Sequence, residues 1–229
     1  MKVIDSKKIW SFKDIETEFD KHILHSIPGY NNIWWTCCHM IKSFISKETI
    51  IYDLGCSTGK QTNFICNSLQ ELDSLKIIGI DAEDSMIKYA KKNYSNKNIL
   101  FHTSNLDKYK FIKANVFLCM FLFNFLEFDM RYKVLKKINK SLKKDGVVFF
   151  ADKVIDDDPT AENLMNQIHL LWKENFFSKR IILTKQEQIR GIMKPITEKK
   201  LNSFFKECGF KKNLISKHLN FNFYLLQKS

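Results

Sequence analysis

Residues 50–59 read Ile-Ile-Tyr-Asp-Leu-Gly-Cys-Ser-Thr-Gly, and their pattern is the strongest indication of the fold. An apolar run that passes through two glycines into a polar segment predicts a buried strand, a tight turn and a helix. Gly55 and Gly59 let the backbone turn sharply and approach a ligand closely. Asp53 places a carboxylate beside the start of the helix, where it suits the ammonium group of a ligand. The pattern therefore predicts a cofactor loop.

A second acidic residue supports this prediction. Asp81 follows the next predicted strand, where a carboxylate accepts hydrogen bonds from two ribose hydroxyls. A nucleotide P-loop would need GxxxxGK[ST], but only three residues separate the two glycines and Lys60 is followed by Gln61. A dinucleotide fingerprint would need GxGxxG, but position 57 is serine. The alternative is an unrelated glycine turn in another α/β protein.

Strand-like and helix-like patterns alternate along the chain. Continuous apolar strands that alternate with helices predict an α/β fold with a doubly wound, mostly parallel seven-stranded sheet and a C-terminal antiparallel hairpin. The predicted strands are Thr49–Leu54, Lys76–Ile80, Ile99–His102, Val116–Phe121, Val147–Ala151, Leu214–Lys217 and Asn220–Leu226. The predicted helices between and after them are Lys60–Leu69, Ser85–Lys92, Met130–Leu142 and Glu198–Cys208.

Two helical additions are expected within a single domain over residues 1–229. The segment Phe12–Phe44 is helical apart from a break at 26–30, and predicts an N-terminal helical cap over residues 1–47. After Ala151 two helical stretches, Thr160–Lys173 and Thr184–Met193, interrupt the alternation. They predict a helical lid over residues 156–196, above the ligand crevice.

Composition limits the kinds of ligand and partner that are expected. The formal net charge is +12, but only three of the 37 basic residues are arginines, which favours a solvated lysine surface over direct nucleic-acid binding. The six cysteines form no CxxC pair and indicate a reduced, cytoplasmic protein. The six histidines lack metal-ligand spacing, so no metal is expected. The sequence contains no apolar run of about 18 residues, so no membrane-spanning helix is predicted.

Several motifs are those of one enzyme family. They are Phe19-Asp20, Ser26-Ile-Pro-Gly-Tyr30-Asn-Asn-Ile33, Tyr52-Asp-Leu-Gly-Cys-Ser57, Phe125-Leu-Glu127 with Arg131, Asp152-Lys153 through His169 to Asn175, and Cys208-Gly-Phe210 with Asn220-Phe221. With them the chain resembles the class I methyltransferases, and more closely the bacterial carboxy-S-adenosylmethionine synthases of tRNA wobble-uridine modification. The resemblance implies a Rossmann-like fold, S-adenosylmethionine as cofactor and a homodimer.

The resemblance also implies a cofactor pocket with three departures from the family pattern. Asn105 replaces the acid beside the adenine amino group, and Met120 replaces an asparagine. The arginine that meets the extra carboxylate of the carboxylated cofactor falls at Gln186 or Glu187, and neither is a cation. The implied cofactor residues are Tyr30, Asp53, Gly55, Cys56, Ser57, Gly59, Asp81, Ala82, Asn105, Leu106 and Met120.

Three functions are compatible with these residues. The first is methyl transfer to a small-molecule acceptor on a carboxy-S-adenosylmethionine synthase-like scaffold. The second is the synthase itself, which would use S-adenosylmethionine and prephenate, with Arg190 or Lys153 taking the carboxylate. The third is a non-catalytic, cofactor-binding regulatory subunit, against which the intact cofactor loop speaks.

Residues for the co-substrate are predicted from their chemistry and their place along the chain. His169 is the candidate general base, because an imidazole titrates near neutrality; alternatively it is a helix histidine bonded to a backbone carbonyl. Asp152 and Lys153 follow a strand at the ligand-binding edge, although they could form a surface ion pair. The candidate substrate residues are Trp35, Asn124, Lys153, Trp172 and Arg190.

Overall fold

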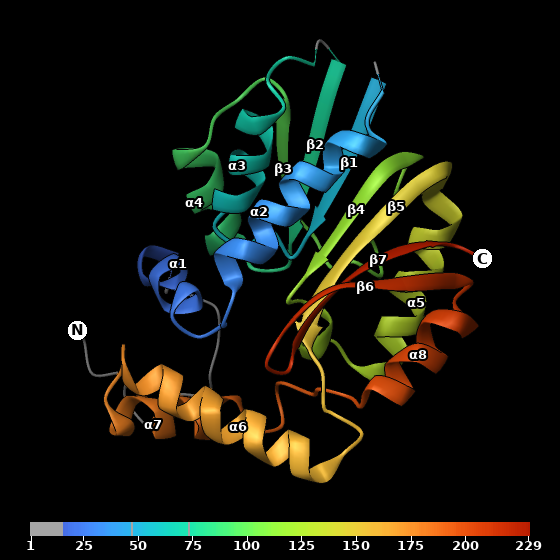
Figure 1. Ribbon diagram of the computed structural model, residues 1–229. Helices are drawn as coiled ribbons and strands as arrows, with labels where there is room; N and C mark the ends of the chain where they lie inside the picture. The colour runs from blue at the N-terminus through green and yellow to red at the C-terminus, as the bar shows by residue number, and fades with distance from the viewer. Residues whose placement is uncertain (1–15, 47, 73) are drawn as a thin grey trace.

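A seven-stranded sheet organises the chain (Figure 1). The computed structural model describes residues 16–46, 48–72 and 74–229. The strand order is β3-β2-β1-β4-β5-β7-β6; the first five are parallel, and β7 runs antiparallel to both β5 and β6. The predicted fold class is thereby confirmed. The strands are β1 Glu48–Leu54, β2 Ser74–Asp81, β3 Ile99–Thr103, β4 Ala114–Met120, β5 Leu142–Lys153, β6 Phe210–His218 and β7 Phe221–Lys228.

Helices cover both faces of the sheet, which explains why the central strands are continuously apolar. Every residue of β4 is buried, as expected for a parallel strand packed on both sides. One core layer joins the sheet to α2, α3 and α4, and the other joins it to α5 and α8. The helices are α1 Glu16–Leu24, α2 Tyr30–Ile41, α3 Lys60–Ser68, α4 Asp84–Asn93, α5 Phe128–Ser141, α6 Pro159–Glu174, α7 Lys179–Ile189 and α8 Glu198–Glu207, with short 3-10 turns at Lys42–Phe44 and Phe123–Phe125.

The carboxyl ends of the parallel strands meet along one edge of the sheet. The strand order reverses between β1 and β4, which creates the crevice where open α/β sheets bind ligands. Helices α1, α6 and α7 lie beyond this edge (Figure 1). The ends of the α6–α7 segment are joined by a parallel bridge between Ile155 and Thr197. Helices α6 and α7 of the predicted lid and α1 of the predicted cap therefore lie beside the crevice, whereas α2 of the cap packs on the sheet and residues 1–15 lie outside the described residues.

Helix α7 begins earlier than predicted. Its first residue is Lys179 rather than Thr184, because the Ser178 side chain accepts a hydrogen bond from the Ile181 N–H and caps the helix. It ends at Ile189, before Gly191 with φ 77°. Arg190 thus falls outside the helix that was predicted to carry it. Among the described residues, no helix is long and apolar enough to cross a membrane.

Candidate functional site

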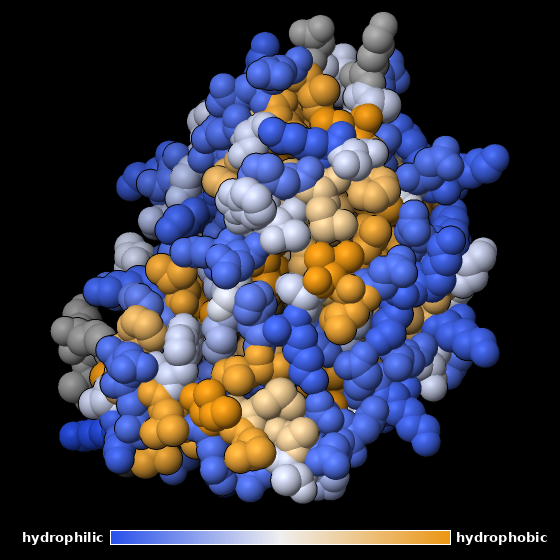
Figure 2. Space-filling view, viewed as in Figure 1, coloured by the Kyte–Doolittle hydropathy of each residue, from blue (hydrophilic) through white to orange (hydrophobic). Residues whose placement is uncertain are grey.

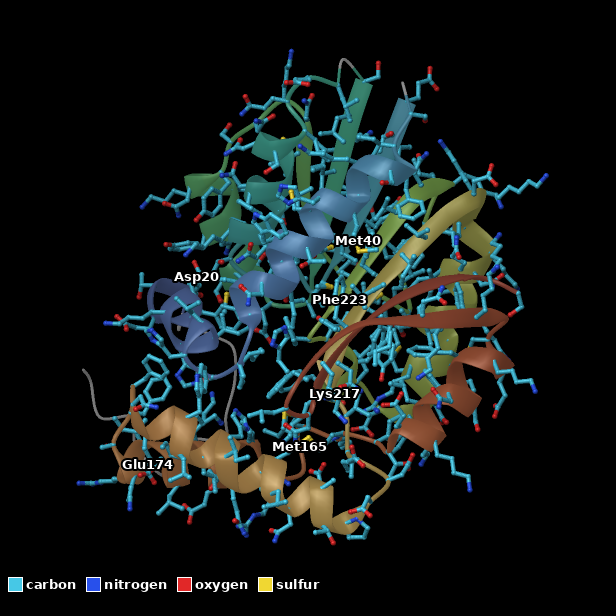
Figure 3. All side chains as sticks on the ribbon, viewed as in Figure 1. Asp20, Met40, Met165, Glu174, Lys217 and Phe223 are labelled. Carbon is cyan, nitrogen blue, oxygen red and sulfur yellow. The ribbon has the colours of Figure 1, made fainter. Side chains whose placement is uncertain are left out.

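A cavity of about 530 Å³ lies at the carboxyl edge of the sheet, within the range of small-molecule pockets. It is lined by the ends of β1, β2, β4 and β5 and by side chains of α1, α6 and α7. Figure 3 labels Asp20 on α1 and Met165 on α6, the helices on either side of this cavity. Every cofactor residue implied by the sequence lines it except Gly59.

The backbone of the loop after β1 turns tightly and lies close to neighbouring residues. Gly55 has φ 71°, and a Cβ added there would lie 2.9 Å from Leu122 Cδ1. Its N–H and that of Cys56 donate to the Ile80 carbonyl at 2.7 and 3.1 Å, which ties the loop to β2. Gly59 has φ 76° and starts α3, so it shapes the loop from behind the cavity wall.

Asp81 ends β2 and faces the same loop. One carboxylate oxygen accepts the Ser57 N–H and the other accepts the Glu83 N–H, both at 2.9 Å. Burial raises the pKa of Asp81, although these two hydrogen bonds favour its charged form. Because a carboxylate has about four acceptor sites, Asp81 can still accept ribose hydroxyls from the cavity.

Two further carboxylates stand near Tyr30. Asp53 is 3% exposed, accepts the Thr62 hydroxyl at 2.6 Å, and has its pKa raised to about 6 by burial. Asp20, on α1, accepts the Thr58 hydroxyl at 2.8 Å and also lines the cavity. We call Asp20, Asp53 and Asp81 the acidic end. It suits a ligand that carries an ammonium group and a ribose.

Three lysines line the opposite part of the cavity, and we call them the basic end: Lys153 at the end of β5, Lys173 on α6 and Lys185 on α7. Burial, with the charge of Lys153, lowers the pKa of Lys173 to about 8. Burial, with the charge of Lys173, lowers the pKa of Lys185 to about 6. The described part of the chain places no carboxylate within ion-pair distance of Lys153 or Lys173. Because a pKa of about 6 leaves Lys185 largely neutral at pH 7, the neighbouring Lys153 and Lys173 are the cations that suit an anionic ligand.

His169 lines the cavity, and its ring is hydrogen-bonded to a backbone carbonyl, as the alternative interpretation predicted. Its Nε2 lies 2.9 Å from the Ser26 carbonyl oxygen, so that nitrogen carries the proton and donates. Burial, and next the charge of Lys173, lowers the pKa of His169 to about 3. The imidazole is therefore neutral and weakly basic, and it ties α6 to the segment before α2.

Asp152 is not part of a surface ion pair, so that interpretation is wrong. It is 4% exposed, and its carboxylate accepts the N–H groups of Asn124 at 2.9 Å and Lys153 at 3.1 Å. Burial raises the pKa of Asp152 to about 7, and the carboxylate lines the cavity. The Lys153 ammonium instead donates to Asn166 at 3.0 Å.

The other candidate substrate residues lie outside the lining that the described residues form. Trp35 is 59% exposed and stacks on His39, because it lies on the outer side of α2. Trp172 packs edge-on against Phe176. Asn124 is buried behind the wall, where it donates to the Lys153 carbonyl, and Arg190 is exposed.

Sequence reasoning did not assign Asp20, Lys173 or Lys185 to the site. Asp20 belongs to a segment that the family resemblance already covered. Lys173 lies one helical turn after His169, so its position on the same face was a usable signal. No such signal existed for Lys185, because the direction of its side chain depends on where α7 begins.

Known proteins match the part of the chain that carries the loop after β1, and some match most of its length. The family model "Methyltransferase domain" matches residues 51–146. A carboxy-S-adenosyl-L-methionine synthase of Staphylococcus epidermidis is 29% identical over 205 residues, which cover 88% of this chain and 89% of the relative. One of Campylobacter jejuni is 28% identical over 228 residues, covering 97% and 95%.

Solved structures share the fold at low sequence identity. The DhpI–SAH complex has a TM-score of 0.62 at 11% identity and covers 95% of this chain and 93% of its own. Human N-acetylserotonin methyltransferase in complex with SAM has a TM-score of 0.60 at 13% identity, covering 99% and 60%. Together, the domain match, the relatives and the sheet topology show that the chain carries a methyltransferase domain on a Rossmann-like sheet and is similar to carboxy-S-adenosyl-L-methionine synthases over most of its length.

Proposed function

We propose that the protein catalyses a one-carbon transfer between S-adenosylmethionine and a small anionic molecule held beside α6 and α7. The separation of charge within one cavity carries this proposal. The cofactor has a positive sulfonium and a positive ammonium group, which the acidic end complements. The basic end would repel those groups, so it suits a second, negatively charged ligand.

The cofactor supplies an activated one-carbon unit, and the residues present fit it. Asp81 would accept the ribose hydroxyls, and Asp20 and Asp53 would receive the ammonium group. Gly55 lines the cavity without a side chain, so it would allow the close approach of the amino-acid portion. Asn105 would accept from the adenine amino group through a neutral oxygen, without charge assistance.

Carboxy-S-adenosylmethionine synthesis is the reaction that this geometry supports best. The absence of a cation at positions 186 and 187 counted against it. However, Lys153 and Lys173 line the same cavity as Gln186, so positive charge is available for a carboxylate. With prephenate as donor, the ring carboxyl carbon would pass to the cofactor's methyl carbon, a methyl proton would leave with the donor's ring hydroxyl as water, and an aromatic keto acid would remain.

Methyl transfer to a small-molecule acceptor is the second candidate. It is favoured by Gln186, which lines the cavity where the resemblance expects an arginine. In this reaction the basic end would hold an anionic group of the acceptor and align its nucleophile with the methyl carbon. Asp152, with a pKa of about 7, would be a better proton acceptor than the weakly basic His169.

One experiment separates the candidates. Purified protein is incubated with S-adenosylmethionine, with and without prephenate, and the nucleosides are identified by mass spectrometry. We expect a carboxylated cofactor and the keto acid in equal amounts, only when prephenate is present. If prephenate is inert but S-adenosylhomocysteine forms with another anionic acceptor, the second candidate is correct. A protein that binds the cofactor and turns over neither would be the non-catalytic subunit.

The family resemblance also leads us to propose a cytoplasmic homodimer. Figure 2 shows apolar side chains over α6, where Leu164, Ile168 and Leu171 are 53%, 49% and 64% exposed. These residues recur at helical spacing, so they form one apolar face. Light scattering on the purified protein tests the dimer, and a monomer at micromolar concentration would contradict it.

A further inference from the structure

A single lysine outside the cavity holds the loop that forms one of the cavity's walls. Lys137, on α5, donates from Nζ to the carbonyl oxygens of Leu106 at 2.7 Å, Asp107 at 2.8 Å and Tyr109 at 2.6 Å. An ammonium group has three N–H donors, so one loop satisfies all three. Hydrogen bonds from a charged donor are about twice as strong as neutral ones.

The surroundings of Lys137 favour a fixed position. Its Nζ lies 5.2 Å from the centroid of the Phe111 ring, and burial lowers its pKa. Helix α5 itself is anchored, because Val134, Leu135 and Ile138 are fully buried against the sheet. The lysine therefore connects a rigid helix to the loop, whose Leu106 and Tyr109 also pack against the core.

The side of this loop that faces away from Lys137 lines the cavity. Ser104, Asn105, Leu106 and Asp107 line the cavity beyond Asp81. The Ser104 N–H donates to the Asp81 carbonyl at 2.8 Å, which fixes the start of the loop. Lys137 fixes its remainder from behind. The wall beside the ribose-binding carboxylate is thus held from two directions.

We propose that Lys137 is a positioning residue for the adenine end of the cofactor. By drawing three carbonyls toward α5, it leaves Asn105 and Leu106 facing the cavity at a set depth. Asn105 can then accept from the adenine amino group. The inference rests on the proposed function, because it takes the ligand of this wall to be adenine.

Lys137→Met tests this, since methionine keeps most of the side-chain volume and removes the donors. The matched control is Lys133→Met, at an exposed lysine one turn earlier on α5. Calorimetry compares S-adenosylhomocysteine with its inosine analogue, in which a carbonyl replaces the amino group. We expect Lys137→Met to weaken S-adenosylhomocysteine binding about tenfold and to bring the affinity ratio of the two ligands close to one. Lys137→Arg should restore much of that ratio, and Lys133→Met should leave it unchanged.

Hydrogen exchange of residues 104–109 gives a second readout without ligand. These amides should exchange faster in Lys137→Met than in the wild type, and Lys137→Gln serves if the methionine variant does not fold. An unchanged ligand ratio with unchanged exchange would overturn the proposal. If the wild-type protein binds neither nucleoside, the proposed function fails, whereas the exchange rates still decide whether Lys137 holds the loop.

Discussion

The two ends of the cavity are assembled in different ways. The acidic end comes mostly from strand ends and the loop between them, with Asp53 and Asp81 held by hydrogen bonds to nearby N–H and hydroxyl groups. The basic end comes from three consecutive elements, namely the end of β5, α6 and α7. Like charges gather at both ends, but the carboxylates of the acidic end are held by N–H and hydroxyl groups of the protein. We infer that the acidic end would receive the cofactor and that the basic end would receive an anion.

Burial first, and then the charge of a neighbouring lysine, lowers the pKa values of Lys173 and Lys185. An anionic ligand would offset that cost. A variant that perturbs one end leaves the other as the internal comparison.

Gly55→Val should have the largest effect, and only at the acidic end. A side chain at φ 71° is strained, and its Cβ would press on Leu122. We expect a loss of about 2–5 kcal/mol in cofactor affinity from strain and overpacking. Calorimetry with S-adenosylhomocysteine measures it, and a melting curve checks that the variant is folded. Undiminished binding by a folded variant would remove this loop from the site.

Lys173→Met should have the next largest effect, and only on the affinity for a ligand at the basic end. A lost hydrogen bond to a charged group is worth about 1.5–3 kcal/mol, so affinity for the anionic co-substrate should fall by that amount while cofactor affinity holds. Lys211→Met, at an exposed lysine, is the control. Equal anion affinity in both variants would mean that the anion binds elsewhere.

Asp81→Ala should weaken cofactor binding by about 1–3 kcal/mol, because it deletes the acceptor of the ribose hydroxyls. Asp81→Asn should lose less, since its amide oxygen still accepts. Calorimetry on the two folded variants measures both losses. A cofactor affinity unchanged by the alanine would exclude Asp81 from the site.

The two ends should respond to pH in opposite directions. Lys185 and then Lys173 lose their charge as pH rises through about 6 and 8, so anion affinity should fall across that range. Asp53 becomes neutral as pH falls through about 6, so cofactor affinity should fall below it. His22 and His169, with pKa values lowered to about 4 and 3 mainly by burial, stay neutral throughout. Parallel pH profiles for the two ligands would contradict the separation.

Arg190→Ala should have the smallest effect. Arg190 is exposed beyond the end of α7, so its replacement should change the affinity for either ligand by less than about 0.5 kcal/mol. Titration of both ligands measures this. A selective loss of anion affinity would show that Arg190 reaches the basic end after all.

The same contrast explains what the sequence could predict. Asp53, Gly55 and Asp81 line the cavity, and local pattern could place them there because they stand at strand ends. Lys185 was missed because the Ser178 cap sets the start of α7 and so the direction in which each of its side chains points. Trp35 was assigned by its aromatic chemistry and Arg190 by its charge and its place on a predicted helix, but α7 ends at Ile189 and both side chains are exposed.

The charge-separated cavity is tested most directly by a crystal structure of the protein with S-adenosylhomocysteine and prephenate together. We predict the amino group of the nucleoside ligand beside Asp20 and Asp53, and a prephenate carboxylate within hydrogen-bond distance, about 2.7–2.9 Å, of the Lys173 or Lys153 ammonium. A carboxylate seated at Arg190, or the carboxylate of the nucleoside ligand itself reaching the three lysines, would contradict the account.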